Sequence, residues 1–242
     1  MRKVRGKRYW LVGASEGLGR ALAITMAKSG AEVIVSARSQ DRLDELVSEM
    51  GSGRAVACDV TDQDSVDTAV AQIGDIDGIV YLAGVYWPMS AADWDAEKAT
   101  QMVEINMMGA FRTIGAVMPQ MTARYSGHIV ITGSLSGFRG LPRTVGYGAS
   151  KAAVMYLAEG MYADLKDTGV DVQVINPGFI KTRLTEKNDF RMPFIMEPEE
   201  AAEEFFNHMK LGGFKRSFPT VFSWLFRVSQ FWPDWLYYRV FR

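Results

Sequence analysis

The sequence has little cysteine, little net charge and no long apolar run. A single cysteine, Cys58, among 242 residues excludes an internal disulfide framework and fits a reducing compartment such as the cytoplasm. The net charge of −1 offers no basic field for nucleic acid, so no such partner is expected. No uninterrupted apolar stretch reaches membrane-spanning length, and the apolar run after the basic residues 1–8 is too brief for a signal peptide.

What the sequence does contain is an alternation of apolar and amphipathic segments, with 48% hydrophobic residues overall. Strands are predicted at 8–13, 31–37, 54–60, 78–84, 128–133 and 171–175, and helices at 20–29, 41–50, 62–73, 96–118 and 147–166. Buried strands separated by helices are typical of a parallel sheet covered on both faces, and right-handed crossovers make it doubly wound. No repeat or linker divides residues 1–242, which predicts a single α/β domain of the Rossmann type with an aromatic-rich, helical C-terminal extension.

A glycine-rich turn connects the first predicted strand to the first predicted helix. It reads Gly13-Ala14-Ser15-Glu16-Gly17-Leu18-Gly19. We expect Gly13 to allow the tight turn, Gly17 to let the backbone approach a pyrophosphate, and Gly19 to let the helix pack on the strand. The alternative is an ordinary glycine-rich connection, but the flanking strand and helix favour a dinucleotide site at the helix N-terminus.

Tyr147 and Lys151 stand four residues apart on a predicted helix, with Ser134 upstream. Residues at this spacing share a helix face, so the phenol and the ammonium can point into one site. We expect the positive charge to lower the tyrosine pKa and to suit Tyr147 for proton transfer with a substrate oxygen. Taken singly, each of these residues could equally be a solvated or structural side chain.

Together these residues resemble the short-chain dehydrogenase/reductase family, over roughly residues 8–185. The family motif Gly-x-x-x-Gly-x-Gly is matched by Gly13, Gly17 and Gly19, and the Pro-Gly motif after the sixth strand by Asn176-Pro177-Gly178. The family's catalytic set maps onto Asn106, Ser134, Tyr147 and Lys151. These four and the following residues are the expected cofactor contacts or catalytic groups: Ser15, Leu18, Arg38, Asp59, Val60, Ala83, Gly84, Ile180 and Thr182.

The resemblance implies hydride exchange between a nicotinamide and a carbonyl or secondary alcohol, without a metal. Tyr147 is expected to transfer the proton, Lys151 to lower its pKa and bind the nicotinamide ribose, and Ser134 to hold the carbonyl oxygen. Asn106 is implied as the holder of a water that relays protons from Lys151. The alternative of a non-catalytic redox sensor that binds NAD(P) has no need of these proton-transfer groups.

Cofactor choice depends on the end of the second strand. Ala37 stands where NAD-binding proteins carry an acid, and Arg38 follows it, which favours the 2′-phosphate of NADP. Many NADP-binding members of the family also carry a basic residue inside the glycine turn, where this chain has Glu16. Tyr81-Leu82-Ala83-Gly84 replaces the family's Asn-Asn-Ala-Gly, and Asp59 could cap a helix instead of contacting adenine.

Residues 183–198 occupy the position of a substrate lid. Phe190, Met192, Phe194 and Met196 are expected either to form an apolar wall over the substrate or to anchor an ordinary loop. Trp87, Met89 and Phe138 are candidates for the same wall. A small hydrophobic carbonyl or alcohol is therefore the expected substrate.

The C-terminal extension, residues 214–242, has eleven aromatic residues, five Lys or Arg and one acid, Asp234. Residues 214–218 are a candidate seventh strand, and Pro233 is expected to end one helix and open another. As a helix, the segment has one narrow polar face at Ser223, Arg227, Gln230 and Asp234, and a broad apolar face. That face needs a cover, which could be a second subunit, the domain's own core or a membrane surface; a homo-oligomer is preferred, and peripheral membrane contact is the second choice.

Overall fold

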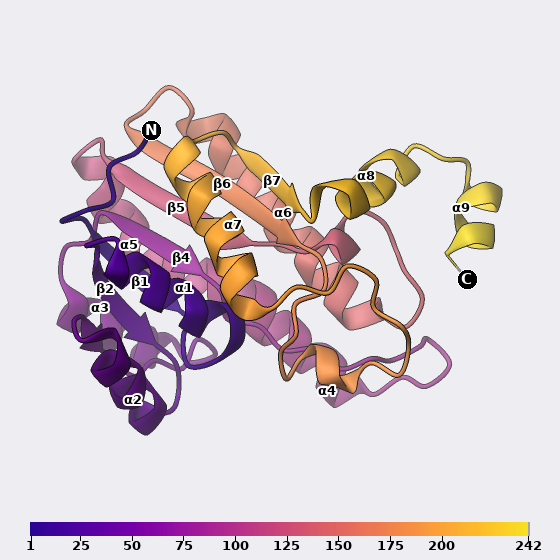
Figure 1. Cartoon of the computed structure of the whole chain (residues 1–242), viewed down its shortest axis with the longest axis horizontal. Coiled ribbons are helices and arrows are strands. Elements are labelled where there is room, and N and C mark those ends of the chain that lie inside the picture. The colour runs from indigo at the N-terminus through magenta and orange to yellow at the C-terminus, as the bar shows by residue number, and fades with distance from the viewer. Residues whose placement is uncertain (242) are drawn as a thin grey trace.

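The computed structural model of the chain describes residues 1–241, which form a seven-stranded parallel sheet between two layers of helices (Figure 1). The strands are β1 (Arg8–Val12), β2 (Glu32–Ser36), β3 (Arg54–Ala55), β4 (Gly78–Tyr81), β5 (Gly127–Thr132), β6 (Val170–Pro177) and β7 (Lys215–Phe218). Their spatial order is β3-β2-β1-β4-β5-β6-β7. The order reverses between β1 and β4, where Val12 pairs with Ser36 on one side and with Tyr81 on the other. This reversal creates a crevice at the carboxyl ends of the strands.

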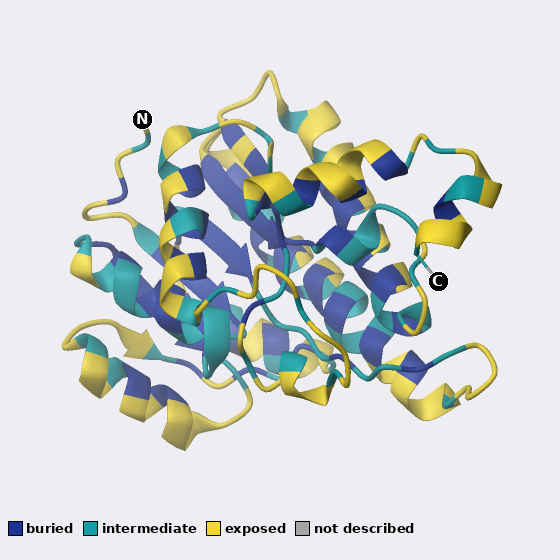
Figure 2. Ribbon diagram, turned by 45° about the vertical axis from the view of Figure 1, so that its right-hand side comes forward, coloured by how far each residue is buried: buried dark blue, intermediate teal, exposed yellow. Residues whose placement is uncertain are grey.

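The helices lie on both faces of the sheet. They are α1 (Gly17–Lys28), α2 (Gln40–Met50), α3 (Gln63–Ile73), α4 (Ala96–Val103), α5 (Gly109–Ala123), α6 (Val145–Leu165), α7 (Pro198–Leu211), α8 (Thr220–Ser229) and α9 (Asp234–Val240), with short helical turns η1 (Glu104–Met108), η2 (Leu135–Gly137) and η3 (Thr185–Lys187). One apolar core joins the sheet to α3, α5 and α6, and a second joins its other face to α1, α2 and α7. Figure 2 shows the buried strands between helices whose outer faces are exposed. Because both faces of the strands are covered, neighbouring residues such as Val130 and Ile131 belong to different cores.

The doubly wound α/β prediction is confirmed, and so is the seventh strand, which pairs with β6. Three details were wrong. The third strand is only two residues long, although the N–H groups of Val56 and Cys58 continue to bond to β2 and the turn after it. The helix predicted at 96–118 is α4, η1 and α5 in succession, with a π-helical turn at 104–108. Helix α7 was missed altogether.

Helix α7 begins with a strong local signal. Pro198 occupies its first turn, and Glu197 and Glu200 form a capping box around the first free N–H groups. Phe205 and Phe206 are buried in the core shared with α1. The helix thereby ends the lid segment and returns the chain to β7.

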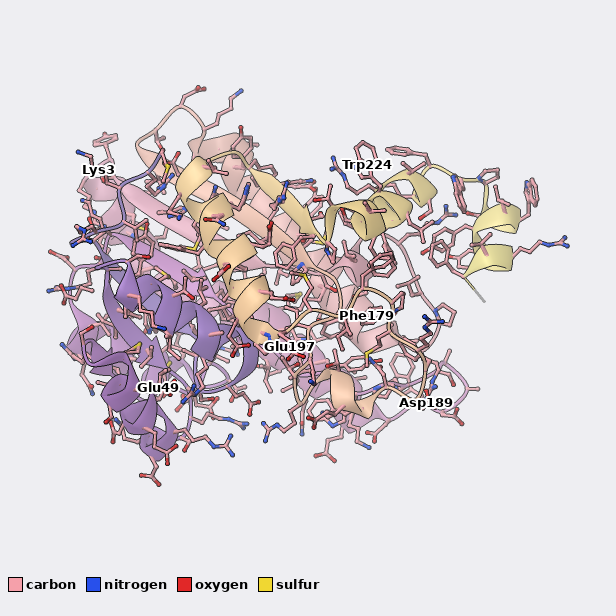
Figure 3. The ribbon with its side chains drawn as sticks, in the orientation of Figure 1. Lys3, Glu49, Phe179, Asp189, Glu197 and Trp224 are labelled. Atoms are coloured by element: carbon pink, nitrogen blue, oxygen red, sulfur yellow. The ribbon has the colours of Figure 1, made fainter. Side chains whose placement is uncertain are left out.

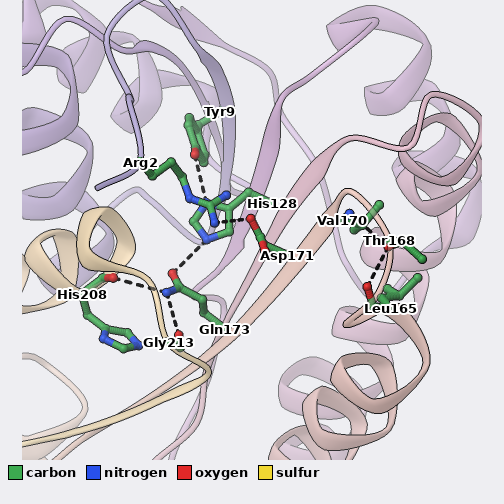
Figure 4. A network of polar contacts seen from close by, with 10 residues as sticks. All are labelled: Arg2, Tyr9, His128, Leu165, Thr168, Val170, Asp171, Gln173, His208 and Gly213. Atoms are coloured by element: carbon green, nitrogen blue, oxygen red, sulfur yellow. Dashed lines mark hydrogen bonds and ion pairs between the residues drawn. The ribbon is translucent and has the colours of Figure 1, made fainter.

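A chain of buried polar contacts runs through the sheet at the amino end of β5 (Figure 4). His128 lies 2.9 Å from the Tyr9 hydroxyl through Nδ1 and 2.8 Å from Gln173 Oε1 through Nε2. Gln173 Nε2 in turn donates to the carbonyls of His208 and Gly213. Burial lowers the pKa of His128 to about 3, so this histidine is neutral and structural, at the opposite end of the strand from the crevice.

Within residues 1–241, no helix is both long enough and apolar enough to cross a bilayer.

Candidate active site

A cavity of about 1240 Å³ occupies the crevice at the carboxyl ends of the strands. It brings together residues that the sequence spreads over 170 positions. The predicted site residues that line it are Gly13, Ser15, Gly17, Leu18, Gly19, Arg38, Asp59, Val60, Ala83, Gly84, Ser134, Tyr147, Lys151, Pro177, Gly178, Ile180 and Thr182. Asn106 was also predicted to contact the cofactor, but it lies behind this wall.

The glycine turn forms one end of the cavity and leads directly into α1. Gly13 adopts a φ of +92°, and a Cβ there would lie 2.4 Å from the backbone nitrogen of Ala83, so the turn can pass β4 only as glycine. Gly17 opens α1, and a Cβ at this position would lie 2.8 Å from Thr182 Cγ2. The carboxylate of Glu16, the N-cap residue, pairs with Arg42 and Arg183 instead of capping the helix. The N–H groups of the first turn therefore remain available to an anion such as a pyrophosphate.

Tyr147 and Lys151 extend from the first two turns of α6 toward Ser134, which follows β5. Lys151 is 4% exposed, and its Nζ donates a 2.9 Å hydrogen bond to the carbonyl of Thr132 at the end of β5. The same Nζ lies 5.8 Å from the centre of the Tyr147 ring. The Tyr86 ring packs edge-on against Tyr147 at 5.0 Å and restricts the phenol from the other side. Tyr147 and Lys151 thus share a helix face, as the spacing predicted, and both side chains line the cavity.

The prediction that the Tyr147 pKa is lowered is wrong. Burial raises the pKa of Tyr147 to about 12, the Ser134 hydroxyl lowers it, and the buried Tyr86 phenol raises it further. Burial also lowers the pKa of Lys151 to about 8, because its ammonium is removed from water. The tyrosine is therefore a protonated phenol at neutral pH, and the lysine is a cation that a modest rise in pH neutralises.

Asn106 has a definite structural part in the site. It lies in the π-helical turn η1, an irregularity that often marks functional positions. Its Oδ1 accepts from the Val85 N–H at 2.7 Å, and its Nδ2 donates to the Val85 carbonyl and to Ser150 Oγ on α6. A Cβ on Gly84 would lie 3.4 Å from Asn106 Oδ1 and 3.7 Å from Lys151 Nζ, so both groups lie close to Gly84. Asn106 thereby ties the loop after β4 to the helix that carries Tyr147 and Lys151.

The Tyr81-Leu82 departure from the family pattern is compensated locally. The Tyr81 hydroxyl donates to the carbonyl of Ile105 in η1, which joins β4 to the π-helical turn. Asp59 lines the cavity and accepts from both the N–H and the hydroxyl of Thr61, so it caps its own turn. The cap of α3 is instead Asp62, whose side chain accepts from Asp64 N–H.

Three arginines surround the far end of the glycine turn. Arg38 and Arg42 line the cavity; Arg38 precedes α2, and Arg42 lies in the first turn of that helix. Glu16 lies between Arg42, at 3.4 Å, and Arg183 of the lid segment, at 2.7 Å. Neither Arg42 nor Arg183 was predicted as a site residue, and Arg183 reaches Glu16 from 167 positions away.

The opposite end of the cavity is lined by apolar side chains, and several of them were not predicted. The apolar residues that line it include Tyr86, Trp87, Leu141, Phe179, Phe190, Phe222, Phe226, Val240 and Phe241. The last four come from α8, α9 and the residue after them. Of the predicted wall, Trp87 and Phe190 are present, whereas Met89, Phe138, Met192, Phe194 and Met196 lie elsewhere. Met89 is buried against Met102, and Phe194 packs on the outer side of Phe222.

The lid segment is fastened to the rim of the cavity by polar contacts. Lys187 Nζ donates to the Tyr86 carbonyl at 2.7 Å, and the Tyr86 hydroxyl donates to Asn188 Oδ1 at 3.0 Å. An ion pair joins Asp189 to Arg143 at 2.6 Å. Figure 3 labels Asp189 within this segment and Phe179 just before it.

The cavity, its glycine-lined end and the uncapped start of α1 fit a nicotinamide dinucleotide, and comparisons with known proteins agree. The family model for short chain dehydrogenases matches residues 7–191. An uncharacterized oxidoreductase of Myxococcus xanthus is 36% identical over 235 residues, which is 94% of this chain and 93% of that protein. An uncharacterized oxidoreductase of Staphylococcus epidermidis is 31% identical over 84% of this chain and 90% of that protein. A solved structure of a short chain dehydrogenase/reductase family protein superposes with a TM-score of 0.81 at 29% identity, over 89% of this chain and 97% of that one.

The chain belongs to the short-chain dehydrogenase/reductase family. It is an oxidoreductase of that family, and the family binds NAD(P).

Proposed function

We propose that this protein exchanges a hydride between NADP(H) and the carbonyl or secondary alcohol of a small hydrophobic compound. The observation that carries the proposal is that Ser134, Tyr147 and Lys151 line one cavity together with the glycine turn. A cavity with convergent proton-transfer groups at one wall and an anion-binding helix start at another suits a dinucleotide beside an organic substrate.

The chain's own residues supply the acid–base chemistry. With its pKa raised to about 12, Tyr147 holds its proton at neutral pH and can donate it to a developing alkoxide. The Ser134 hydroxyl, which lowers the pKa of the Tyr147 phenol, orients the carbonyl oxygen of the substrate. The Lys151 ammonium stabilises the phenolate that remains after donation, and Asn106 fixes the loop beside that ammonium. A bound nicotinamide supplies or accepts the hydride.

The preference for NADP rests on charge around the glycine turn. Arg38 and Arg42 offer two guanidinium groups to a 2′-phosphate, and Ala37 places no carboxylate there. Glu16 lies in the glycine turn where many NADP-binding members of the family carry a basic residue. Its negative charge is offset by ion pairs with Arg42 and Arg183, which supports the preference for NADP.

The substrate class follows from the apolar end of the cavity. Aromatic side chains from four parts of the chain surround it, among them Trp87, Phe179 and Phe226. A carbonyl compound with a hydrophobic body would place that body against these rings and its oxygen toward Tyr147.

Oxidation of NADPH in the presence of a panel of hydrophobic carbonyl compounds tests the proposal, with NADH in parallel. Tyr147→Phe is expected to bind the dinucleotide normally and to lose about 10²- to 10⁴-fold in turnover. Tyr86→Phe is the matched control, because it removes a neighbouring hydroxyl that bonds to Asn188, and it should retain most turnover. Near-normal reduction by Tyr147→Phe would refute the assignment.

A further inference from the structure

Helix α8 has apolar side chains on its outer side as well as on its inner side. Val221, Trp224, Leu225 and Val228, at helical spacing, are exposed, whereas Ser223 and Ser229 are buried. Figure 3 shows the side chain of Trp224 pointing away from the body of the protein. The predicted narrow polar face is therefore wrong: Ser223 faces inward and Arg227 outward. Of the broad apolar face that was predicted, the domain itself covers Phe222 and Phe226, whereas the exposed residues are left without a cover from the domain's own core.

The exposed surface continues from α8 onto the following turn and α9. We name it the α8–α9 face, and it consists of Val221, Trp224, Leu225, Val228, Phe231, Trp235 and Tyr238. Phe231 is 83% exposed and Trp235 71%. Large apolar side chains gathered on one surface mark a contact with a protein or a membrane.

The two helices are held in this orientation by the rest of the molecule. Arg139 Nη1 donates to the carbonyls of Ser229 and Trp232, and its guanidinium stacks on the Tyr237 ring. On α8, the buried Ser223 hydroxyl donates to the carbonyl of Ser217 on β7 at 3.4 Å. The outward position of the aromatic rings is thus fixed by specific contacts on the inner side.

The charges on this surface are positive. Arg227 and Arg239 are exposed, and the Arg227 guanidinium lies 5.2 Å from the Trp224 ring centre. Asp234, the acid of this segment, pairs with Arg139. Tryptophan, tyrosine and arginine side by side are the residues that favour the interface between a bilayer and water, and the arginines attract anionic headgroups.

We propose that the α8–α9 face docks on the surface of an anionic lipid bilayer, with its rings among the headgroups and no helix crossing the membrane. The charges favour lipid over a second copy of the chain. A two-fold contact through this face would bury the exposed Arg227 and Arg239 of both copies, while the one acid of residues 214–242, Asp234, already pairs with Arg139. Figures 1 and 2 also show α9 standing out from the body at one end of the molecule, a shape that suits insertion better than a flat subunit contact.

The inner sides of the same helices line the cavity. Phe222 and Phe226 of α8, and Phe241 after α9, belong to its apolar end. Docking therefore places the substrate end of the cavity next to the lipid, so that a hydrophobic carbonyl compound can enter from the bilayer; this step rests on the proposed function.

Vesicle co-sedimentation tests the docking without cofactor or substrate, so its result is independent of the enzymatic proposal. Phosphatidylcholine vesicles with and without phosphatidylglycerol are compared, at low and high salt. The test variant is Trp224→Ser/Phe231→Ser/Trp235→Ser. The control is Trp94→Ser/Tyr156→Ser/Leu211→Ser, three apolar residues elsewhere with matching exposure (57, 78 and 71% against 55, 83 and 71%).

The expected result is binding of the parent to the anionic vesicles, weakened by salt, unchanged in the control and at least about tenfold weaker in the test variant. A parent protein that stays in the supernatant would overturn the proposal. An equal loss of vesicle binding in the test and control variants would overturn it as well. Sedimentation velocity without lipid identifies the competing occupant. If the parent is oligomeric and does not bind vesicles, and the test variant is monomeric, the α8–α9 face instead contacts a second copy of the chain.

Discussion

The guanidinium of Arg139 lies 4.1 Å from the centre of the Tyr237 ring and joins the segment after Ser134 to the last helix of the chain. Arg139 also donates to three carbonyls around the end of α8, those of Ser229, Gln230 and Trp232. One side chain thus connects the segment after Ser134 to the extension that lines the apolar end of the cavity.

Arg139→Ala should loosen α8 and α9, because it removes the cation–π contact and leaves the helix-end carbonyls without their donor. The expected local loss is about 1–3 kcal/mol. Hydrogen exchange of α8 and α9 amides measures it, and KM for a hydrophobic carbonyl should rise while dinucleotide affinity holds. Arg139→Lys keeps the charge but lacks the planar guanidinium, so its hydrogen exchange in α8 and α9 should lie between that of the parent and that of Arg139→Ala. Unchanged exchange in Arg139→Ala would show that the extension is held by its apolar contacts alone.

Removing the arginines beside the glycine turn should affect the two cofactors differently. Arg38→Ala/Arg42→Ala is expected to weaken NADPH binding by about 10- to 100-fold and to leave NADH binding within about threefold, since only NADPH carries the 2′-phosphate. Cofactor affinity is measured by fluorescence titration. Arg54→Ala, an exposed arginine on β3 outside the cavity, is the control. If NADPH and NADH binding were weakened equally, the two arginines would stabilise the site as a whole and would not recognise the 2′-phosphate.

The sequence allowed the prediction of those parts of the site that depend on short-range pattern. Parallel strands end at one edge of the sheet, so motifs after strands converge there whatever the details of packing. This places the glycine turn, Ser134 and Pro177 around one cavity, and the spacing of Tyr147 and Lys151 places both on one helix face. The signal for α7 was also present, in Pro198 and its capping box, and was overlooked.

Other features depend on contacts that no local pattern contains. Arg183 meets Glu16, and Arg139 meets Tyr237, only because the lid and the extension fold back over the cavity. Helix α8 is apolar over most of its circumference, so hydrophobic spacing alone does not define which side faces inward. Inward packing of Phe226 and the contacts of Arg139 at the end of the helix leave Trp224 on the outside. The raised pKa of Tyr147 likewise follows from its burial, which outweighs the opposing effect of the Ser134 hydroxyl and which a spacing of four residues does not define.

Carbonyl reduction should decline as pH rises through about 8. Burial lowers the pKa of Lys151 to about 8, so above that pH the ammonium loses its charge and no longer stabilises the phenolate of Tyr147. The pH profile of kcat measures this. Lys187 also lines the cavity and has a lowered pKa, so Lys187→Met is the control and should keep the decline. In Lys151→Arg, whose guanidinium stays protonated, residual activity should lack the decline; a decline that persists there would assign it to another group.

The buried His128 should make the protein sensitive to acid. Its pKa is about 3 in the folded protein and 6.5 in its ordinary state, so between these values the unfolded chain binds a proton that the folded one does not. Stability from this residue is therefore fully present above pH 6.5 and is lost as pH falls toward 3, by up to roughly 4 kcal/mol. Urea unfolding at a series of pH values measures the slope.

His128→Gln removes the titrating ring and should flatten the slope between pH 6.5 and 3. It should also lower stability at pH 7 by about 1–3 kcal/mol, because the buried Tyr9 hydroxyl loses its partner at Nδ1. His208, whose pKa burial also lowers, is the competing source of acid sensitivity. His208→Gln should therefore keep most of the slope if His128 is its main origin. A slope that survives in His128→Gln and disappears in His208→Gln would transfer the acid sensitivity to the histidine on α7.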